Sequence, residues 1–134
     1  MMRDFQRSKV YKAERAAWEC CDPEKLLSLE ECQKLIKKAV RFMGRKCIPK
    51  VTDGRGRRKA AFKFGALRGG PQIALPKWSR TRWIVLHEYA HAVADDEHGP
   101  KFARAYIKLV HRFIGKIEAE ILKMAFKQYR VKTR

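Results

Sequence analysis

Three of the four histidines in this chain fall within 12 consecutive positions and surround one glutamate. His87 and His91 are four residues apart, Glu88 directly follows the first of them, and His98 comes after a short polar stretch. Side chains four residues apart share one face of an α-helix, about 6 Å from each other, so both imidazoles can reach one ion. The spacing therefore predicts a helix from about residue 79 or 80 to residue 94, followed by a turn long enough to fold back.

Zinc suits this donor set, because it accepts three nitrogen ligands and keeps a fourth position for water. We expect one Zn²⁺ per chain, with His87 and His91 as two of its ligands. Glu88 lies beside the fourth position without having to bind the metal, so it can act as a general base. The metal lowers the pKa of the water, the carboxylate takes its proton, and a polarised carbonyl is attacked. The residue chemistry alone predicts zinc-assisted hydrolysis of a carbonyl compound.

A third ligand is required, and several side chains could supply it. His98 is favoured because Gly99 and Pro100 mark a sharp bend into a new helix, which would hold the imidazole at a fixed junction. Neutral nitrogen also competes well for zinc. The acidic alternatives, which the sequence leaves open, are Asp95, Asp96, Glu118 and Glu120.

The chain is strongly basic, since 32 Lys and Arg against 14 Asp and Glu give a net charge of +18. The excess is concentrated in residues 32–86, which hold 16 basic residues and one acid. So positive a field attracts polyanions, and nucleic acid is the commonest of these inside a cell. We expect sequence-independent binding of DNA or RNA; a solvated basic surface with no partner is the alternative. The expected contacts form a helix face and a hairpin loop: Lys34, Lys37, Lys38 and Arg41, and Arg55, Arg57, Arg58 and Lys59.

Hydrophobic periodicity and turn residues predict an α+β fold, with helices around a small, mostly antiparallel sheet. A capping box of Ser28 and Glu31 should begin a helix that Gly44 ends. Another helix is expected at residues 4–18, and two more follow Pro100. Short strands are expected in three places: residues 47–52, 59–66 and 72–75. In the last helix the inward-facing residues should be Ile117, Ile121 and Ala125.

The length of 134 residues suits a single domain with one hydrophobic core. Within it, we expect residues 1–27 to form an N-terminal helical extension and residues 128–134 a frayed basic tail. No apolar run approaches the roughly 20 residues that a membrane-spanning helix needs, and no apolar stretch follows the basic start. The four cysteines lack Cys-x-x-Cys spacing and fit a reducing compartment. We therefore expect a cytoplasmic protein with no membrane partner.

The run from His87 to His91, with His98-Gly99-Pro100-Lys101-Phe102 downstream, resembles the SprT-like zinc metallopeptidases, which include the Spartan-type DNA-dependent proteases. In that family a His-Gly-Pro-x-Phe run supplies the third ligand, which implies His98 here. The resemblance implies a compact zincin-like domain with the His-Glu-x-x-His motif on a central helix. It also implies a protease that hydrolyses peptide bonds of proteins, including proteins bound to nucleic acid.

The clear resemblance covers about residues 72–106, and the segment from Arg3 to Tyr11 is similar to small phage-encoded members, which would work in the host cytoplasm. The strand at residues 72–75 resembles the edge strand with which the family can bind a substrate backbone. The main alternative is a basic nucleic-acid-binding protein with a structural or vestigial zinc site, although such a site has no use for Glu88. A nuclease is disfavoured, because phosphodiester hydrolysis usually uses oxygen-rich, often two-metal sites.

Overall fold

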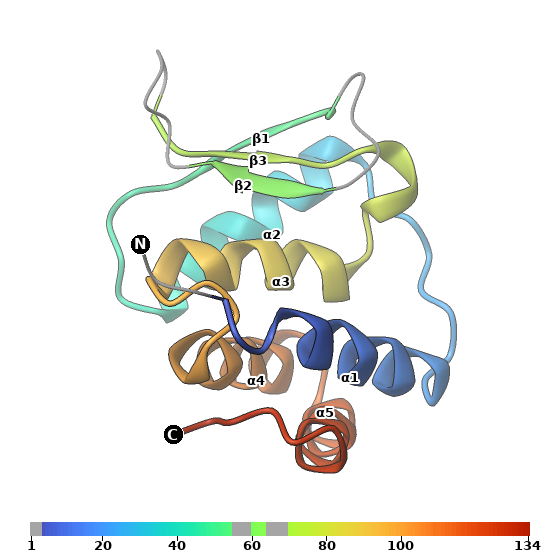
Figure 1. Cartoon of the computed structure of the whole chain (residues 1–134). Coiled ribbons are helices and arrows are strands. Elements are labelled where there is room, and N and C mark those ends of the chain that lie inside the picture. Colours follow the sequence, from blue (N-terminus) through green and yellow to red (C-terminus); the bar gives the residue numbers. More distant parts are fainter. Residues whose placement is uncertain (1–3, 55–59, 64–69) are drawn as a thin grey trace. The chain divides into compact units, whose positions relative to one another are not determined.

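The computed structural model describes residues 4–54, 60–63 and 70–134 of the chain. These residues form five α-helices and one three-stranded sheet, so the α+β class is as expected (Figure 1). The chain divides into two compact units, one made of residues 24–92 and the other of residues 1–23 together with residues 93–134. In the described part of the chain, no helix is long and apolar enough to cross a membrane.

The unit of residues 24–92 begins with a helix whose limits agree with its capping residues. Ser28 and Glu31 form the predicted capping box, with two reciprocal hydrogen bonds of 3.0 Å between side chain and backbone N–H. Gly44, at a φ of 68°, follows the helix end in the left-handed conformation that glycine adopts easily. The elements of this unit are α2 (Leu29–Phe42), β1 (Lys50–Thr52), β2 (Ala61–Lys63), β3 (Gln72–Ala74), a short 3₁₀-helix (Lys77–Ser79) and most of α3 (Arg82–Val93).

The sheet is mixed, with the strand order β1-β3-β2. Ile73 of β3 pairs with Val51 in the parallel direction and with Phe62 in the antiparallel direction. Successive strands do alternate in direction, but β3 is inserted between the two earlier strands, so it runs parallel to β1. The prediction of a mostly antiparallel sheet therefore holds for only one of its two pairings. The assignment of residues 72–75 to an edge strand was wrong, because β3 is the central strand.

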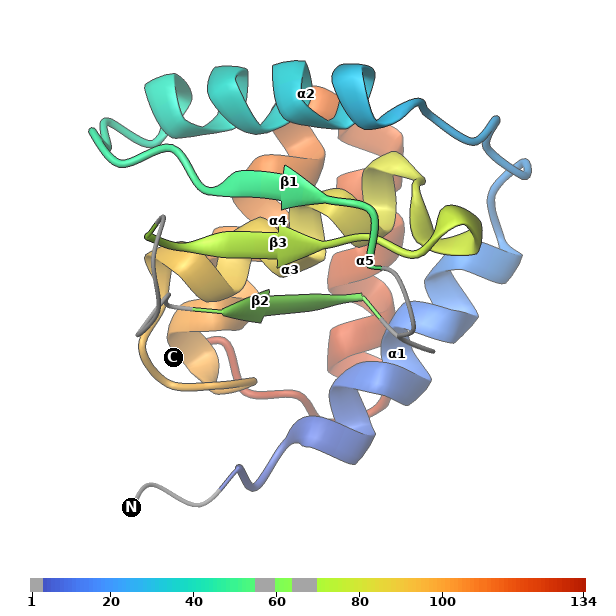
Figure 2. The ribbon, with the colours of Figure 1, turned by 90° about the horizontal axis from the view of Figure 1, so that it is seen from above.

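A side chain of α2 covers the outer edge of β1. The Gln33 amide accepts a hydrogen bond from Val51 N–H at 2.9 Å and donates one to the Pro49 carbonyl at 3.1 Å. A strand edge without such a partner offers its backbone to other chains. Figures 1 and 2 show α2 running beside β1, and Figure 1 shows α2 and α3 on the same side of the sheet.

The other unit contains α1 (Arg7–Glu19), α4 (Pro100–Phe113) and α5 (Lys116–Gln128), and α5 packs against both of the other helices. The orientation expected for α5 was wrong in part, since Ile117 is 72% exposed and Ile121 is only half-buried. Helix α5 has two stripes of apolar residues with helical spacing. The stripe that is buried is the one that ends in Phe126. Its buried residues are Ala119, Leu122, Ala125 and Phe126.

Residues 128–134 are held in place, so the prediction of a frayed tail was wrong. Val131 is buried, and the backbone of Lys132 makes two hydrogen bonds to the Gln6 side chain, of 2.7 and 3.1 Å. Arg104 donates a further hydrogen bond of 2.7 Å to the Thr133 carbonyl. These partners lie far away in the sequence, so composition alone could not reveal them.

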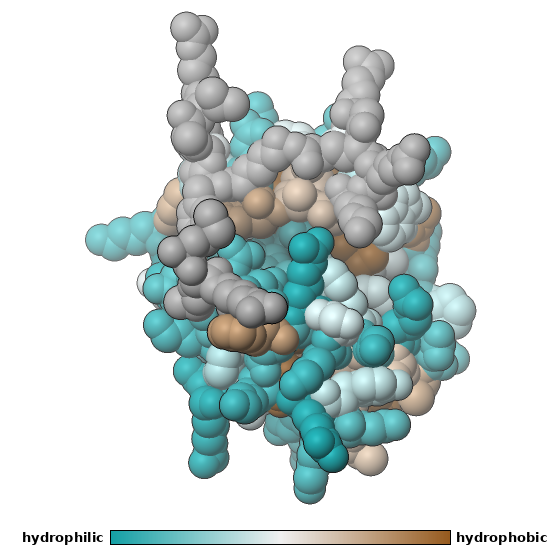
Figure 3. Space-filling view, in the orientation of Figure 1, coloured by the Kyte–Doolittle hydropathy of each residue, from teal (hydrophilic) through white to brown (hydrophobic). Residues whose placement is uncertain are grey.

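Hydrophilic side chains predominate on the face drawn in Figure 3.

Candidate metal centre

Helix α3 carries the first two histidines and the glutamate. Its start is anchored, because Thr81 accepts a hydrogen bond from Ile84 N–H at 3.2 Å and Arg82 pairs with Glu24 at 2.5 Å. His87 is buried and His91 is half-buried, and their ring centroids are 5.0 Å apart. The four-residue spacing therefore places both imidazoles on one side of α3, as predicted.

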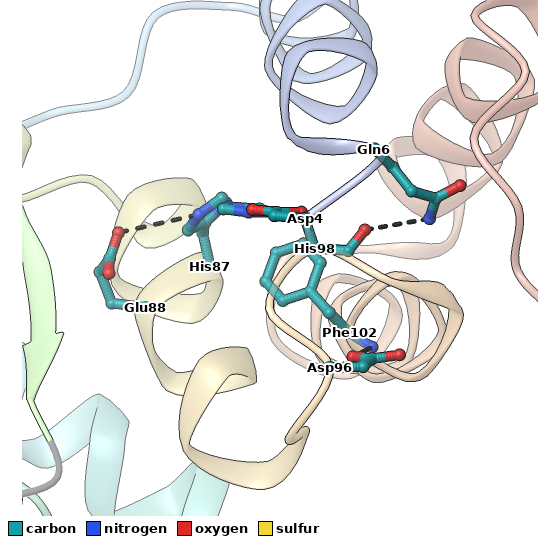
Figure 4. A network of polar contacts seen from close by, with 7 residues as sticks. All are labelled: Asp4, Gln6, His87, Glu88, Asp96, His98 and Phe102. Atoms are coloured by element: carbon teal, nitrogen blue, oxygen red, sulfur yellow. Dashed lines mark hydrogen bonds and ion pairs between the residues drawn. The ribbon is translucent and has the colours of Figure 1, made fainter. Parts of the chain in front are cut away.

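Glu88 is only 8% exposed and its carboxylate is turned toward His87 (Figure 4). The distance from Glu88 Oε2 to His87 Nε2 is 3.8 Å, which is too long for a hydrogen bond between these two atoms. The dashed line between them in Figure 4 therefore marks a contact within ion-pair distance and not a hydrogen bond. A buried carboxylate beside an imidazole is the arrangement that a general base near a metal ligand needs.

His98 lies in the turn before α4 and is held on several sides. Asp4 Oδ2 is 2.7 Å from His98 Nδ1, and the Gln6 side chain donates a hydrogen bond of 3.0 Å to the His98 carbonyl (Figure 4). The rings of Tyr11 and Phe102 approach the imidazole edge-on, each with a centroid distance of 5.1 Å. His98 itself is 5% exposed. Both its side chain and its backbone are therefore fixed.

The two aspartates of the same turn have different partners. Asp96 accepts hydrogen bonds from Lys101 N–H at 2.7 Å and Phe102 N–H at 3.0 Å, so its carboxylate caps the first turn of α4. Asp95 is exposed and forms an ion pair of 3.2 Å with the Lys101 side chain. The hydrogen bond and charge of Lys101 lower the pKa of Asp95 below its ordinary value. The carboxylate of Glu120, also exposed, pairs with Lys123 at 3.1 Å.

The three motif histidines come together. One nitrogen from each of His87, His91 and His98 lies within 4.8 Å of the other two, close enough to hold one metal ion. Among the residues that the structure describes, no other group of three or more His, Cys, Asp or Glu side chains has this property, and none of the acidic alternatives belongs to the group. Three imidazole nitrogens are a donor set that zinc and its neighbours in the first transition row accept.

Asp4 and Gln6 are site residues that the sequence did not reveal. They lie 94 and 92 positions before His98 and belong to none of the motifs. The sequence drew attention only to the segment from Arg3 to Tyr11 as a whole, and assigned neither residue a role.

The cationic residues predicted to contact nucleic acid are described only in part. Four of them follow one exposed face of α2: Lys34, Lys37, Lys38 and Arg41. Lys34 is also 3.7 Å from Glu30, in an exposed ion pair. The hairpin-loop cluster lies outside the described residues: Arg55, Arg57, Arg58 and Lys59.

The four cysteines form no disulfide. They do not belong to the histidine group, and Cys32 is buried in the packed face of α2.

Comparisons with protein-family models, with curated proteins and with solved structures find no match for this chain.

Proposed function

We propose that the chain is a zinc-dependent metallopeptidase of the SprT-like type, with a zincin-like fold. His87, His91 and His98 hold one Zn²⁺, and Glu88 is the general base. The observation that carries the proposal is the close approach of three imidazole nitrogens, with the Glu88 carboxylate beside the first of them. Zinc fits this donor set because catalytic zinc sites use three protein ligands and keep one position open.

When bound, zinc lowers the pKa of a water molecule and polarises the substrate carbonyl. Glu88 removes one proton from the attacking water, whose oxygen forms the new bond to the carbonyl carbon. Glu88 then donates that proton to the amide nitrogen as the carbon–nitrogen bond breaks. Because Glu88 and His87 are both buried, their electrostatic interactions are less screened than they would be in water.

Proteins bound to DNA or RNA are the proposed substrates. The exposed cations of α2 and the net charge of +18 favour a polyanionic partner, which these residues would bind through phosphates without reading base sequence. Such binding would raise the concentration of nucleic-acid-bound proteins near the enzyme. The proposed place of action is a cytoplasm, that of a host cell if the chain is phage-encoded, because a reducing compartment keeps cysteines out of disulfides, as they are here.

Metal analysis combined with digestion of a protein–DNA mixture tests this proposal. Purified protein should contain about one zinc per chain, and His91→Ala should lose it, because two remaining ligands bind poorly. Glu88→Gln should retain zinc and fold but lose about 10²- to 10⁴-fold in hydrolysis, as expected for loss of a general base. The matched control is Glu120→Gln, which makes the same change at an exposed glutamate and should leave both properties unaltered.

Two outcomes would contradict the proposal in different ways. If Glu88→Gln lost its metal, Glu88 would be a ligand and the assigned mechanism would be wrong. If the wild type held zinc and bound nucleic acid but cleaved no protein, the chain would be a nucleic-acid-binding protein with a structural or vestigial zinc site.

A further inference from the structure

We infer that Asp4 is a positioning residue for the metal centre, because it determines which nitrogen of His98 faces the metal. The inference rests on the proposed metal site, but it concerns contacts that the structure shows directly. Asp4 Oδ2 lies 2.7 Å from His98 Nδ1, and the two side chains are 20% and 6% exposed. An ionised carboxylate can only accept hydrogen bonds, so Nδ1 must carry the proton and donate it.

The proton on Nδ1 leaves the lone pair of a neutral His98 ring on Nε2. A metal binds the nitrogen that carries the lone pair, so the hydrogen bond to Asp4 selects Nε2 as the ligand atom. In many metal sites a carboxylate holds a histidine ligand in this way and makes it more basic. The chemistry of this contact therefore assigns Asp4 a role that its position outside every motif did not suggest.

The aromatic neighbours of His98 cannot make this selection. Tyr11 and Phe102 approach the imidazole edge-on, at interplanar angles of 73° and 68°, and so restrict the plane of the ring. A ring turned by half a rotation would occupy nearly the same space, since the two orientations exchange nitrogen with carbon atoms of similar size. Only a polar contact distinguishes these orientations, and Asp4 supplies it.

Gln6 complements Asp4 by holding the backbone of His98. Its amide donates hydrogen bonds to the carbonyls of His98 and Lys132, at 3.0 and 3.1 Å, and accepts one from Lys132 N–H at 2.7 Å. Gln6 is only 7% exposed, so these bonds are made away from solvent and are costly to break. Asp4 therefore holds the side chain of the proposed third ligand, and Gln6 holds its backbone.

Zinc affinity and the tautomer of His98 provide two independent tests. Asp4→Asn should weaken zinc about 10- to 100-fold, the usual effect of removing such a supporting contact. Competition with a chromophoric chelator measures this loss. The matched control is Asp22→Asn, which makes the same change at an exposed aspartate of the same compact unit and should leave the affinity unchanged.

The tautomer is read in metal-free protein by long-range ¹⁵N–¹H NMR of the imidazoles, at about pH 8.5, where an ordinary histidine is neutral. Wild-type His98 should carry its proton on Nδ1, and Asp4→Asn should shift the population toward Nε2–H. This measurement on the wild type remains decisive even if the variant does not fold.

An Nε2–H tautomer of His98 in the wild type would overturn the inference, as would a folded Asp4→Asn protein with unchanged zinc affinity and an unchanged tautomer. Absence of zinc from the wild type would instead refute the proposed function. The NMR result would then still show whether Asp4 orients His98.

Discussion

Replacing Gly99 with alanine should destabilise the turn before α4, because the absence of a side chain at this position leaves room for the Asp96 carboxylate. The φ of Gly99 is −78°, which any residue can adopt, so backbone freedom is not the reason for glycine. A Cβ added here would lie 2.5 Å from Asp96 Oδ2 and 2.8 Å from Asp96 Cγ. The same carboxylate caps α4 through Lys101 N–H and Phe102 N–H. The two shortest contacts are with the capping carboxylate, so we expect the clash to displace the cap.

The expected cost follows from the two hydrogen bonds at stake. Loss of a helix-capping side chain costs about 0.5 to 2 kcal/mol, and loss of a negative charge near a helix N-terminus adds about 0.3 to 1 kcal/mol. We therefore expect Asp96→Ala to lower the free energy of unfolding by about 1 to 3 kcal/mol, and Gly99→Ala to cost at least as much. The double variant should cost little more than the larger single change, because a shortened Asp96 side chain removes most of the clash.

Urea unfolding of metal-free protein, followed by circular dichroism, measures all three variants against the wild type. Asp95→Ala is the control, since the neighbouring aspartate is exposed and makes only a surface ion pair, so its loss should change stability little. A coupling of about 1 kcal/mol between the two positions is expected. If the costs of Gly99→Ala and Asp96→Ala simply added, the reasoning about the shared carboxylate would be refuted.

Two further predictions concern charge and pH. Changing three exposed cations of α2 to glutamine should weaken nucleic-acid binding and reduce the slope of log K against log salt by up to about 3, because each phosphate contact contributes about 0.9. Those cations are Lys37, Lys38 and Arg41. The controls are three exposed lysines of α5: Lys116, Lys123 and Lys127. Binding titrations measure both slopes. Equal slopes for the two triple variants would show that the exposed cations of α2 do not contact the nucleic acid. Burial raises the pKa of the Cys32 thiol to about 11 from an ordinary value of 9.0. As the pH rises through this interval, the thiol of the unfolded chain loses its proton before that of the folded chain. The free energy of unfolding should therefore fall across the same interval. Cys32→Ala should remove this part of the pH dependence in urea unfolding, and an unchanged slope would contradict the assignment.

The parts of the structure that the sequence predicted are those in which neighbouring residues determine the outcome. The capping box at Ser28, the end of α2 near Gly44 and the helix through His87 and His91 each depend on residues a few positions apart. The buried spacing of α4, including Phe102, is local in the same sense. Periodicity and capping therefore predicted these elements correctly.

The features that were missed depend on residues far apart in the chain. The position of β3 between the other strands is set by pairing between distant residues, such as Lys50 and Gln72, which are 22 positions apart. No local pattern in Ile73 or its neighbours distinguishes a central strand from an edge strand. Ile117 and Phe126 both fit a helical stripe, and only packing against other helices decides which one is buried. Asp4 is an ordinary polar residue until the fold brings it to His98.

The discontinuous construction of one compact unit has a consequence for protein synthesis. Helix α1 leaves the ribosome before residues 24–92, whereas α4 and α5, which belong to the same unit as α1, leave it after them. Gln6 acquires its full set of hydrogen bonds only after Lys132 has emerged, 126 positions later. A nascent chain that has exposed His87 and His91 therefore still lacks the fixed third imidazole. At the proposed metal site, tight metal binding should therefore follow the emergence of Lys132 and not that of His91.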